Sequence, residues 1–120
     1  MACDGYVLVV DDDGLIRDFL VSVIGERYKL CVKAVSDGRA ALNILLDSPP
    51  PLLILIDIMM PIMDGIEFIR QKDLQANWAD IPVCVMTASA VPLVNLSGIV
   101  SVFRKPFGVE ALMPLVKRYC

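Results

Sequence analysis

The chain has 120 residues and a formal net charge of -3, with 57% hydrophobic and 21% charged residues. Its length fits a single domain over residues 1–120, because single domains typically run to about 100–150 residues. The composition predicts a well-buried globular core and argues against disorder. The slight acidity offers no basic surface for nucleic acid, and no apolar run approaches the roughly 18–20 residues that span a bilayer.

The N-terminus and the cysteines bear on the compartment. MACDGYVLVVDDD has no basic segment before its apolar run, so it does not resemble a secretory signal, and we expect a cytoplasmic protein with no membrane contact. The sequence contains no C-x-x-C pair and no histidine, which argues against a zinc site. We expect reduced structural thiols at the four cysteines, Cys3, Cys31, Cys84 and Cys120.

The first apolar run, YVLVV at residues 6–10, is rich in β-branched residues and ends abruptly in three acids, which indicates a buried strand. The next segment, residues 15–24, has the spacing of an amphipathic helix. The three acids precede it, at the positive end of the helix, where negative charge is favoured. The apolar positions of this helix are Leu15, Ile16, Phe19, Leu20, Val23 and Ile24.

A second strand and helix follow. LCVKAV at residues 30–35 predicts the strand. Ser36 and Asp37 supply capping side chains for a helix that runs to about Leu46. DSPPP at residues 47–51 ends that helix, because proline lacks the backbone N–H that a helix needs.

The third and fourth strands are predicted at residues 52–57 and 81–88, where the apolar runs LLILI and IPVCVM lie. Asp64 and Gly65 are typical of the start of a helix between these strands. The apolar residues of that helix are Ile66, Phe68, Ile69 and Leu74.

The last part of the chain is less regular. A helix is expected at residues 89–98, but Pro92 and Gly98 predict that it is short or irregular. IVSVF at residues 99–103 predicts a fifth strand, and a Lys-Pro turn at 105–106 leads into a final helix. The apolar face of that helix carries Val109, Leu112, Met113 and Val116.

Five apolar strands that alternate with helices predict a parallel sheet covered on both faces. In such a sheet, ligands bind beyond the carboxyl ends of the strands. Asp11, Asp12, Asp57, Thr87 and Lys105 all lie at or just after a predicted strand end, so we expect them at one edge. Each alone also has a structural interpretation, such as a helix cap or a solvated lysine; their joint arrival at the edge favours a functional site.

The chemistry of this edge follows from its charges. Three carboxylates about 4–5 Å apart repel by about 3–4 kcal/mol per pair at an effective dielectric constant near 20. Oxygen ligands without cysteine or histidine suit Mg²⁺, and Lys105 adds a fixed positive charge. An ionised Asp57 placed there can attack phosphorus and form an aspartyl phosphate without any general base, because a carboxylate attacks without losing a proton.

The chain contains four characteristic sequence blocks in this order: VLVVDDD, LLILIDIMMPIMDG, VMTA and FRKPF. In these blocks and their order, it resembles the receiver domains of two-component response regulators over nearly its whole length. The resemblance implies a flavodoxin-like, doubly wound α/β fold with strand order 2-1-3-4-5. It implies a phosphoprotein of a phosphorelay, in which Asp57 accepts a phosphoryl group from a phosphohistidine on a sensor histidine kinase or phosphotransfer protein. Phosphorylation would then switch the binding of an output domain or protein. The sequence leaves open whether the protein forms a homodimer.

The same resemblance assigns roles by position. Asp12 and Asp57 would be Mg²⁺ ligands, Asp11 would act through water, and the backbone carbonyl of Met59 would complete the protein ligands. Thr87 and Lys105 would bind phosphoryl oxygens. Small Ala88 would leave the site open, and Pro106 would follow a cis peptide bond. The implied protein is a phosphoacceptor switch and not an enzyme beyond phosphorylating and dephosphorylating itself.

Two departures concern signalling. Receivers usually carry an aromatic residue three positions before the lysine, but this chain has Val102 there, with Phe103 on the opposite side of the strand. Thr87 and Lys105 are 18 positions apart, fewer than is usual, which matches a short fourth helix. These departures favour an alternative, a pseudo-receiver that binds partners without phosphorylation.

Two further expectations concern chemistry. Haloacid-dehalogenase-type phosphatases also use a strand-end aspartate, but their D-x-D-x-T pattern fails at Leu15, so a phosphatase is disfavoured. Neither Met59 nor Ser89 carries an acid or carboxamide that could position a hydrolytic water. We therefore expect slow self-dephosphorylation.

Overall fold

The computed structural model describes residues 5–28, 30–88 and 96–120. The strands are β1 (Tyr6–Val10), β2 (Cys31–Val35), β3 (Leu53–Asp57), β4 (Val83–Thr87) and β5 (Ile99–Arg104). The helices among the described residues are α1 (Gly14–Tyr28), α2 (Gly38–Asp47), α3 (Gly65–Asp73) and α4 (Val109–Tyr119). Each strand lies within two residues of its predicted bounds. The helix expected at residues 89–98 falls largely on 89–95, outside the described residues.

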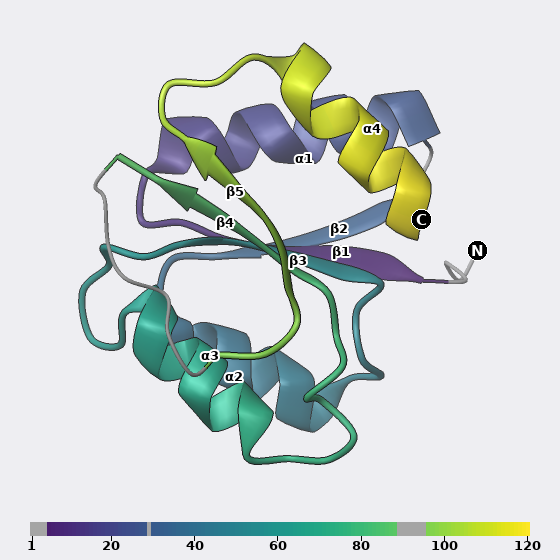
Figure 1. The fold of residues 1–120 in the computed structure, drawn as a ribbon. Helices are drawn as coiled ribbons and strands as arrows, with labels where there is room; N and C mark the ends of the chain where they lie inside the picture. Colours follow the sequence, from purple (N-terminus) through teal and green to yellow (C-terminus); the bar gives the residue numbers. More distant parts are fainter. Residues whose placement is uncertain (1–4, 29, 89–95) are drawn as a thin grey trace.

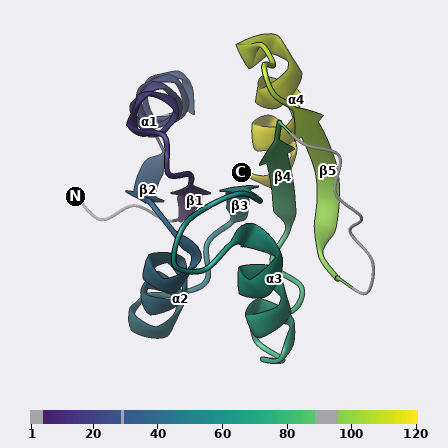
Figure 2. The ribbon, with the colours of Figure 1, turned by 90° about the vertical axis from the view of Figure 1, so that its left-hand side faces the viewer.

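All five strands pair in parallel in the order β2-β1-β3-β4-β5, which confirms the predicted doubly wound α/β fold. Helices α1 and α4 cover one face of the sheet, and α2 and α3 cover the other (Figures 1 and 2). Because every strand runs the same way, all five carboxyl ends meet at one edge.

The core has two layers because successive strand residues point to opposite faces. Leu8, Ile54 and Val85 pack with α2 and α3, whereas Val9, Leu55 and Met86 pack with α1 and α4. Every residue of the three central strands β1, β3 and β4 is buried. This burial on both faces explains why the strands are continuous apolar runs and not alternating ones.

The helix starts confirm the capping predictions for two helices. The Asp37 side chain accepts a hydrogen bond from the Ala40 N–H at 2.9 Å and caps α2. The Asp64 side chain accepts one from the Glu67 N–H at 2.9 Å and caps α3. These aspartates satisfy backbone donors that the first turn of a helix leaves unpaired.

The prediction of buried apolar faces is wrong for parts of α1 and α3. Leu15 is 82% exposed and Phe19 is 48% exposed, whereas Leu20 and Ile24 are the buried residues of α1. Leu74 is 75% exposed, since α3 ends one residue earlier. Spacing along a helix does not reveal where the helix passes the edge of the sheet beneath it.

The cysteine prediction also needs a correction. Cys31 is disulfide-bonded, so the expectation of reduced thiols is wrong there. Cys84 and Cys120 are free. Burial raises the pKa of the Cys84 thiol to about 12, which makes it unreactive. Sequence spacing does not show which cysteines the fold brings within bonding distance, and Cys3 lies outside the described residues.

Among the described residues, no helix has both the length and the apolar character that crossing a membrane requires.

Candidate functional site

Three carboxylates meet at the carboxyl edge of the sheet, as predicted. Asp57 ends β3 and Asp11 directly follows β1, and these neighbouring strands are in register, with Val10 opposite Ile56. Asp12 lies next along the chain. One carboxylate oxygen from each acid lies within 4.8 Å of the other two. Asp11 and Asp57 are buried, whereas Asp12 is exposed, so the cluster opens to solvent on the Asp12 side.

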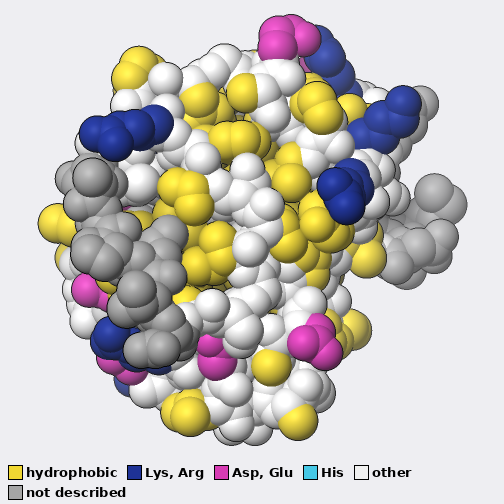
Figure 3. Space-filling view, viewed as in Figure 1, with side chains coloured by type: hydrophobic (Ala, Val, Ile, Leu, Met, Phe, Trp, Pro, Cys, Tyr) yellow, Lys and Arg dark blue, Asp and Glu magenta, His cyan; other side chains and the backbone are white. Residues whose placement is uncertain are grey.

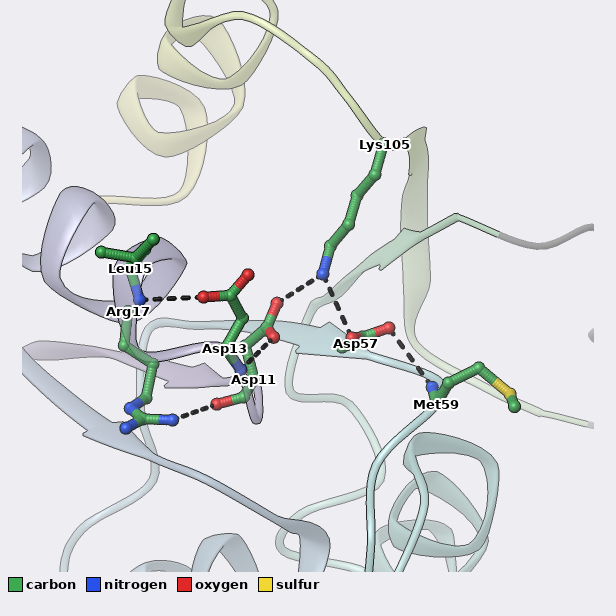
Figure 4. A network of polar contacts seen from close by, with 7 residues as sticks. All are labelled: Asp11, Asp13, Leu15, Arg17, Asp57, Met59 and Lys105. Carbon is green, nitrogen blue, oxygen red and sulfur yellow. Dashed lines mark hydrogen bonds and ion pairs between the residues drawn. The ribbon is translucent and has the colours of Figure 1, made fainter.

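Lys105 reaches these acids from beyond the end of β5 (Figure 4). Its Nζ donates hydrogen bonds to Asp11 Oδ2 at 2.7 Å and to Asp57 Oδ2 at 3.1 Å. Its backbone N–H donates to the carbonyl oxygen of Thr87 at 2.8 Å, which ties the lysine to the end of β4. Lys105 therefore forms one charged network with Asp11 and Asp57, which lie 94 and 48 positions earlier in the sequence.

Burial and charge compete at this network. Burial raises the pKa of the Asp11 carboxyl above its usual value, and the hydrogen bond from Lys105 opposes that effect without cancelling it. Burial is the largest single effect and would lower the pKa of Lys105, but the hydrogen bonds to Asp11 and Asp57 and the negative charges of these two acids together outweigh burial and raise it. Lys105 is therefore a firmly charged cation that compensates two buried acids, which explains how an acid can follow the apolar run of β3.

Backbone groups orient the acids. The Asp13 N–H donates to Asp11 Oδ1 at 2.9 Å, so the Asp11 carboxylate is held on one oxygen by its own loop and on the other by Lys105. Asp57 is held in the same way: the Met59 N–H donates to Oδ1 at 3.2 Å, while Lys105 binds Oδ2. Both buried carboxylates thus have fixed orientations (Figure 4).

Gly65 has a role that sequence analysis missed. A Cβ at this position would lie 2.3 Å from the carbonyl oxygen of Asp57 and 3.0 Å from Cα of Ile58. The Gly65 N–H also donates to the Ile58 carbonyl at 2.9 Å. The loop after Asp57 therefore folds back against the end of β3, and glycine is needed for this close approach. The Asp-Gly pair pointed to a helix start, but nothing in it revealed the contact with Asp57.

The remaining predicted residues lie at or near the same edge. Thr87 is buried and ends β4, one position after Met86, which pairs with Asp57. Met59 lies in the loop after β3 with its side chain 62% exposed, and a metal contact of its carbonyl stays a prediction. The peptide bond before Pro106 is cis, as predicted.

Val102 and Phe103 point to opposite faces of β5, also as predicted. The Val102 side chain is 50% exposed. Phe103 is half-buried among residues of α1 and α4, and its ring centroid lies 5.4 Å from that of Phe107. The position that is usually aromatic in receivers is therefore a small, exposed aliphatic residue here.

The donor set of the acid cluster fits a hard cation. Asp11, Asp12 and Asp57 provide carboxylate oxygens alone, at mutual distances that one ion can bridge. Mg²⁺ binds such oxygens and keeps several waters. The open side at Asp12 leaves room for those waters.

The fold and the site together define a doubly wound α/β domain with an oxygen-lined acidic pocket and a fixed lysine at the carboxyl edge of its sheet. The chain belongs to the response regulator receiver domain family, whose model matches residues 7–117.

Individual relatives agree with this assignment. Response regulator MprA of Mycolicibacterium vanbaalenii is 35% identical over 112 residues, which cover 89% of this chain and 46% of that protein. The chain thus spans about half the length of the curated relatives it matches. The receiver domain of a signal transduction histidine kinase from Syntrophus aciditrophicus is similar in structure, with a TM-score of 0.84, 28% identity and coverage of 96% of this chain and 89% of that one.

A further similar structure is the receiver domain of the sensor histidine kinase PA1611 from Pseudomonas aeruginosa, with a TM-score of 0.80 and coverage of 96% of each chain. That protein has a magnesium ion coordinated in its active site cleft. At 22% identity, the similarity shows a shared fold.

Proposed function

We propose that this receiver domain accepts a phosphoryl group from a phosphohistidine onto Asp57 with the help of Mg²⁺, and that phosphorylation switches its binding to an output domain or protein. One observation carries the proposal: Lys105 Nζ lies 3.1 Å from Asp57 Oδ2 and 2.7 Å from Asp11 Oδ2, inside a cluster of three acids. A carboxylate with a fixed cation on one side and oxygen ligands for a second cation on the other is equipped for phosphoryl transfer.

The transfer balances without a proton from Asp57. A carboxylate oxygen of Asp57 attacks phosphorus, and a P–O bond forms while the P–N bond of the phosphohistidine breaks. The electron pair of that bond stays on the imidazole nitrogen of the donor, which takes a proton from solvent if it needs one. Lys105 and the Thr87 hydroxyl would bind the phosphoryl oxygens and stabilise their negative charge. Mg²⁺ held by Asp11, Asp12 and Asp57 would supply further charge neutralisation.

The phosphodonor needs a surface beside Asp57, and an apolar pocket lies there. It has a volume of about 410 Å³, includes Lys105 in its wall, and is lined further by Ile16, Phe19, Leu20, Ala88, Pro106 and Phe107. Phe19 of α1, which lines this pocket, is 48% exposed. We expect a sensor kinase or phosphotransfer protein to place an apolar surface here, because burying such side chains favours association.

This surface yields a prediction. Phe19→Ala should lower the rate of phosphoryl transfer from a phosphohistidine protein about tenfold, because a half-buried aromatic contact is lost, whereas phosphorylation by acetyl phosphate should be unchanged. The two rates are measured side by side on the same preparation. Val21→Ala, an exposed residue of the same helix, is the control. Equal losses with both donors would mean that Phe19 supports the site and not the partner.

The output face is proposed on the β5 side. Apolar side chains gather across the face that Figure 3 shows, which β5 crosses. Val100 and Val102 of β5 are 39% and 50% exposed. A partner protein, an output domain or a second copy of the chain could bury these residues.

We expect a cytoplasmic protein, no catalytic turnover of other substrates and slow self-dephosphorylation; Ser89, part of the last expectation, lies outside the described residues.

A second candidate function is the phosphorylation-independent interaction module. Exposed Val102 favours it, because an aliphatic side chain cannot make the rotation between buried and exposed states that an aromatic ring makes in other receivers. The ordered network of Asp11, Asp57 and Lys105 opposes it, since a module that never binds phosphate has no need for these buried charges.

Trapping the adduct tests the proposal. Incubation with Mg²⁺ and acetyl phosphate, or with a beryllofluoride mimic, should give a labile adduct that is absent in Asp57→Asn. Asp47→Asn, an exposed acid at the end of α2, should behave like the unmodified protein. An adduct that persists in Asp57→Asn would remove the proposal. Amide spectra of Val102 and Phe103 that stay unchanged on adduct formation would instead favour the interaction module.

A further inference from the structure

Arg17 makes a contact that the proposed function does not yet use. It lies in the first turn of α1, and its Nη1 donates a hydrogen bond to the backbone carbonyl oxygen of Asp11 at 2.7 Å (Figure 4). The bond is partly buried and spans six residues. A hydrogen bond from a charged donor at this distance is stronger than an ordinary one. A side chain on a helix thus holds the backbone of the loop that carries the acid cluster.

The position of this hydrogen bond in the loop is informative. The carbonyl that Arg17 binds belongs to the peptide unit joining Asp11 to Asp12, two of the three acids of the cluster. The units on either side have other anchors: the Asp11 N–H donates to the Val35 carbonyl at 3.1 Å, and the Asp13 N–H donates to the Asp11 carboxylate at 2.9 Å. Arg17 therefore fixes the orientation of this peptide plane. That orientation sets the direction in which the chain continues from the end of β1 to Asp12.

The sequence around Arg17 fits this role. A Cβ at Gly14 would lie 3.4 Å from Arg17 Nη2, an ordinary contact distance, which shows that the guanidinium lies directly beside the start of α1. The Arg17 backbone N–H donates to the Asp13 carbonyl at 3.1 Å, which is the regular hydrogen bond that starts α1 and places Arg17 one turn from the loop. Arg17 thus connects the start of α1 with the backbone between the acids.

We propose that Arg17 is a positioning residue for the cation site: by holding the Asp11 carbonyl, it orients Asp11 and Asp12 for a divalent metal ion. This inference rests on the proposed function, which requires that the acids bind Mg²⁺. Arg17 touches neither the metal nor the phosphoryl group. Its effect passes through the peptide unit between two ligands, and partners of this kind typically change metal affinity 10- to 100-fold when they are removed.

Electrostatic repulsion alone predicts the opposite change in Mg²⁺ affinity when Arg17 is removed. A guanidinium close to the site repels a divalent cation, so removing Arg17 would tighten Mg²⁺ binding if electrostatics dominated. The positioning role predicts weaker binding. The sign of the change in Mg²⁺ affinity therefore separates the two effects, and a purely structural role would lower the melting temperature without changing the affinity of the folded protein.

The experiment is a calorimetric Mg²⁺ titration of the unmodified chain and of Arg17→Met, Arg17→Gln and Arg17→Lys, with thermal unfolding measured on each. Arg27→Met is the matched control, because Arg27 is an exposed arginine in the last turn of the same helix. We expect Arg17→Met and Arg17→Gln to bind Mg²⁺ about tenfold more weakly. Arg17→Lys should lie nearer the unmodified protein, and Arg27→Met should match it.

Unchanged or tighter Mg²⁺ binding in folded Arg17→Met would overturn the proposal. If that variant does not fold, Arg17→Gln decides in the same way, because glutamine is uncharged and shorter but tolerated in helices. At saturating Mg²⁺ the extent of beryllofluoride adduct should be equal in Arg17→Met and the unmodified protein, which supports a role in metal affinity. An unmodified protein that binds no Mg²⁺ would overturn the proposed function as well, so the two failures are distinguishable.

Discussion

Asp11 is completely buried and keeps its carboxylate beside two other acids, with Lys105 2.7 Å away as compensation. Burial raises the pKa of Asp11 above its ordinary value of 3.8, even though the hydrogen bond from Lys105 acts in the opposite direction. The charge on Asp11 therefore reduces the stability of the metal-free fold at neutral pH. Individual side chains at this site are arranged for binding at the expense of stability.

This imbalance predicts a pH dependence. A carboxyl whose pKa is raised on folding stabilises the protein below the unfolded value of 3.8, and this contribution is lost as pH rises through the folded pKa. Without Mg²⁺, Asp11→Asn should therefore be more stable than the unmodified protein at pH 7, and the difference should shrink as pH falls toward 3.8. Urea unfolding across this range measures it.

Adding Mg²⁺ should reverse the order, because the ion stabilises the unmodified protein more than the variant that lacks one carboxylate. A stability difference between the two proteins that is constant with pH and unaffected by Mg²⁺ would contradict this account of Asp11.

At the scale of elements, the turn from β3 into α3 connects the fold with the chemistry. Gly65 begins α3 and also approaches the carbonyl oxygen of Asp57 so closely that a Cβ would lie 2.3 Å from it. Gly25, within α1, offers a contrast, because a Cβ there would make an ordinary contact of 3.8 Å with the Leu30 carbonyl. The same substitution thus tests two different roles of glycine in helices.

Gly65→Ala should lower the free energy of unfolding by about 1–3 kcal/mol, because backbone atoms must move to admit the methyl group. It should also weaken Mg²⁺ binding, since the movement displaces Asp57. Gly25→Ala should raise stability by about 0.5–1 kcal/mol through its helix propensity and leave Mg²⁺ binding unchanged. Urea denaturation and calorimetry measure the two quantities. A Gly65→Ala variant as stable as the unmodified protein would show that the loop does not need this close approach.

At the scale of the whole molecule, the sequence predicted what depends on periodicity. Buried strands are continuous apolar runs, so their positions and the parallel sheet followed from the pattern. The convergence of Asp11, Asp57 and Lys105 followed from topology, because carboxyl ends of parallel strands meet at one edge. These features depend on the order of elements and not on the details of packing.

Features that depend on packing could not be predicted. Lys72 is completely buried and donates to the carbonyl oxygens of Trp78 and Ala79 at 3.2 and 2.8 Å, and nothing in the residues around it indicates a buried lysine. The roles of Gly65 and Arg17 are contacts with backbone atoms, which no side-chain pattern encodes. The disulfide bond of Cys31 likewise depends on three-dimensional proximity.

In the proposed function, Asp57 receives a phosphoryl group at a cation-dependent site. The most direct measurement is peptide mapping by mass spectrometry after incubation with acetyl phosphate, with Mg²⁺ in one sample and a chelator in the other, and with borohydride to trap the acyl phosphate. We predict one modified residue, Asp57, in the sample with Mg²⁺ and little modification in the chelated sample. Modification at Asp11 or Asp12, or equal modification of Asp57 in both samples, would contradict the role proposed for Asp57.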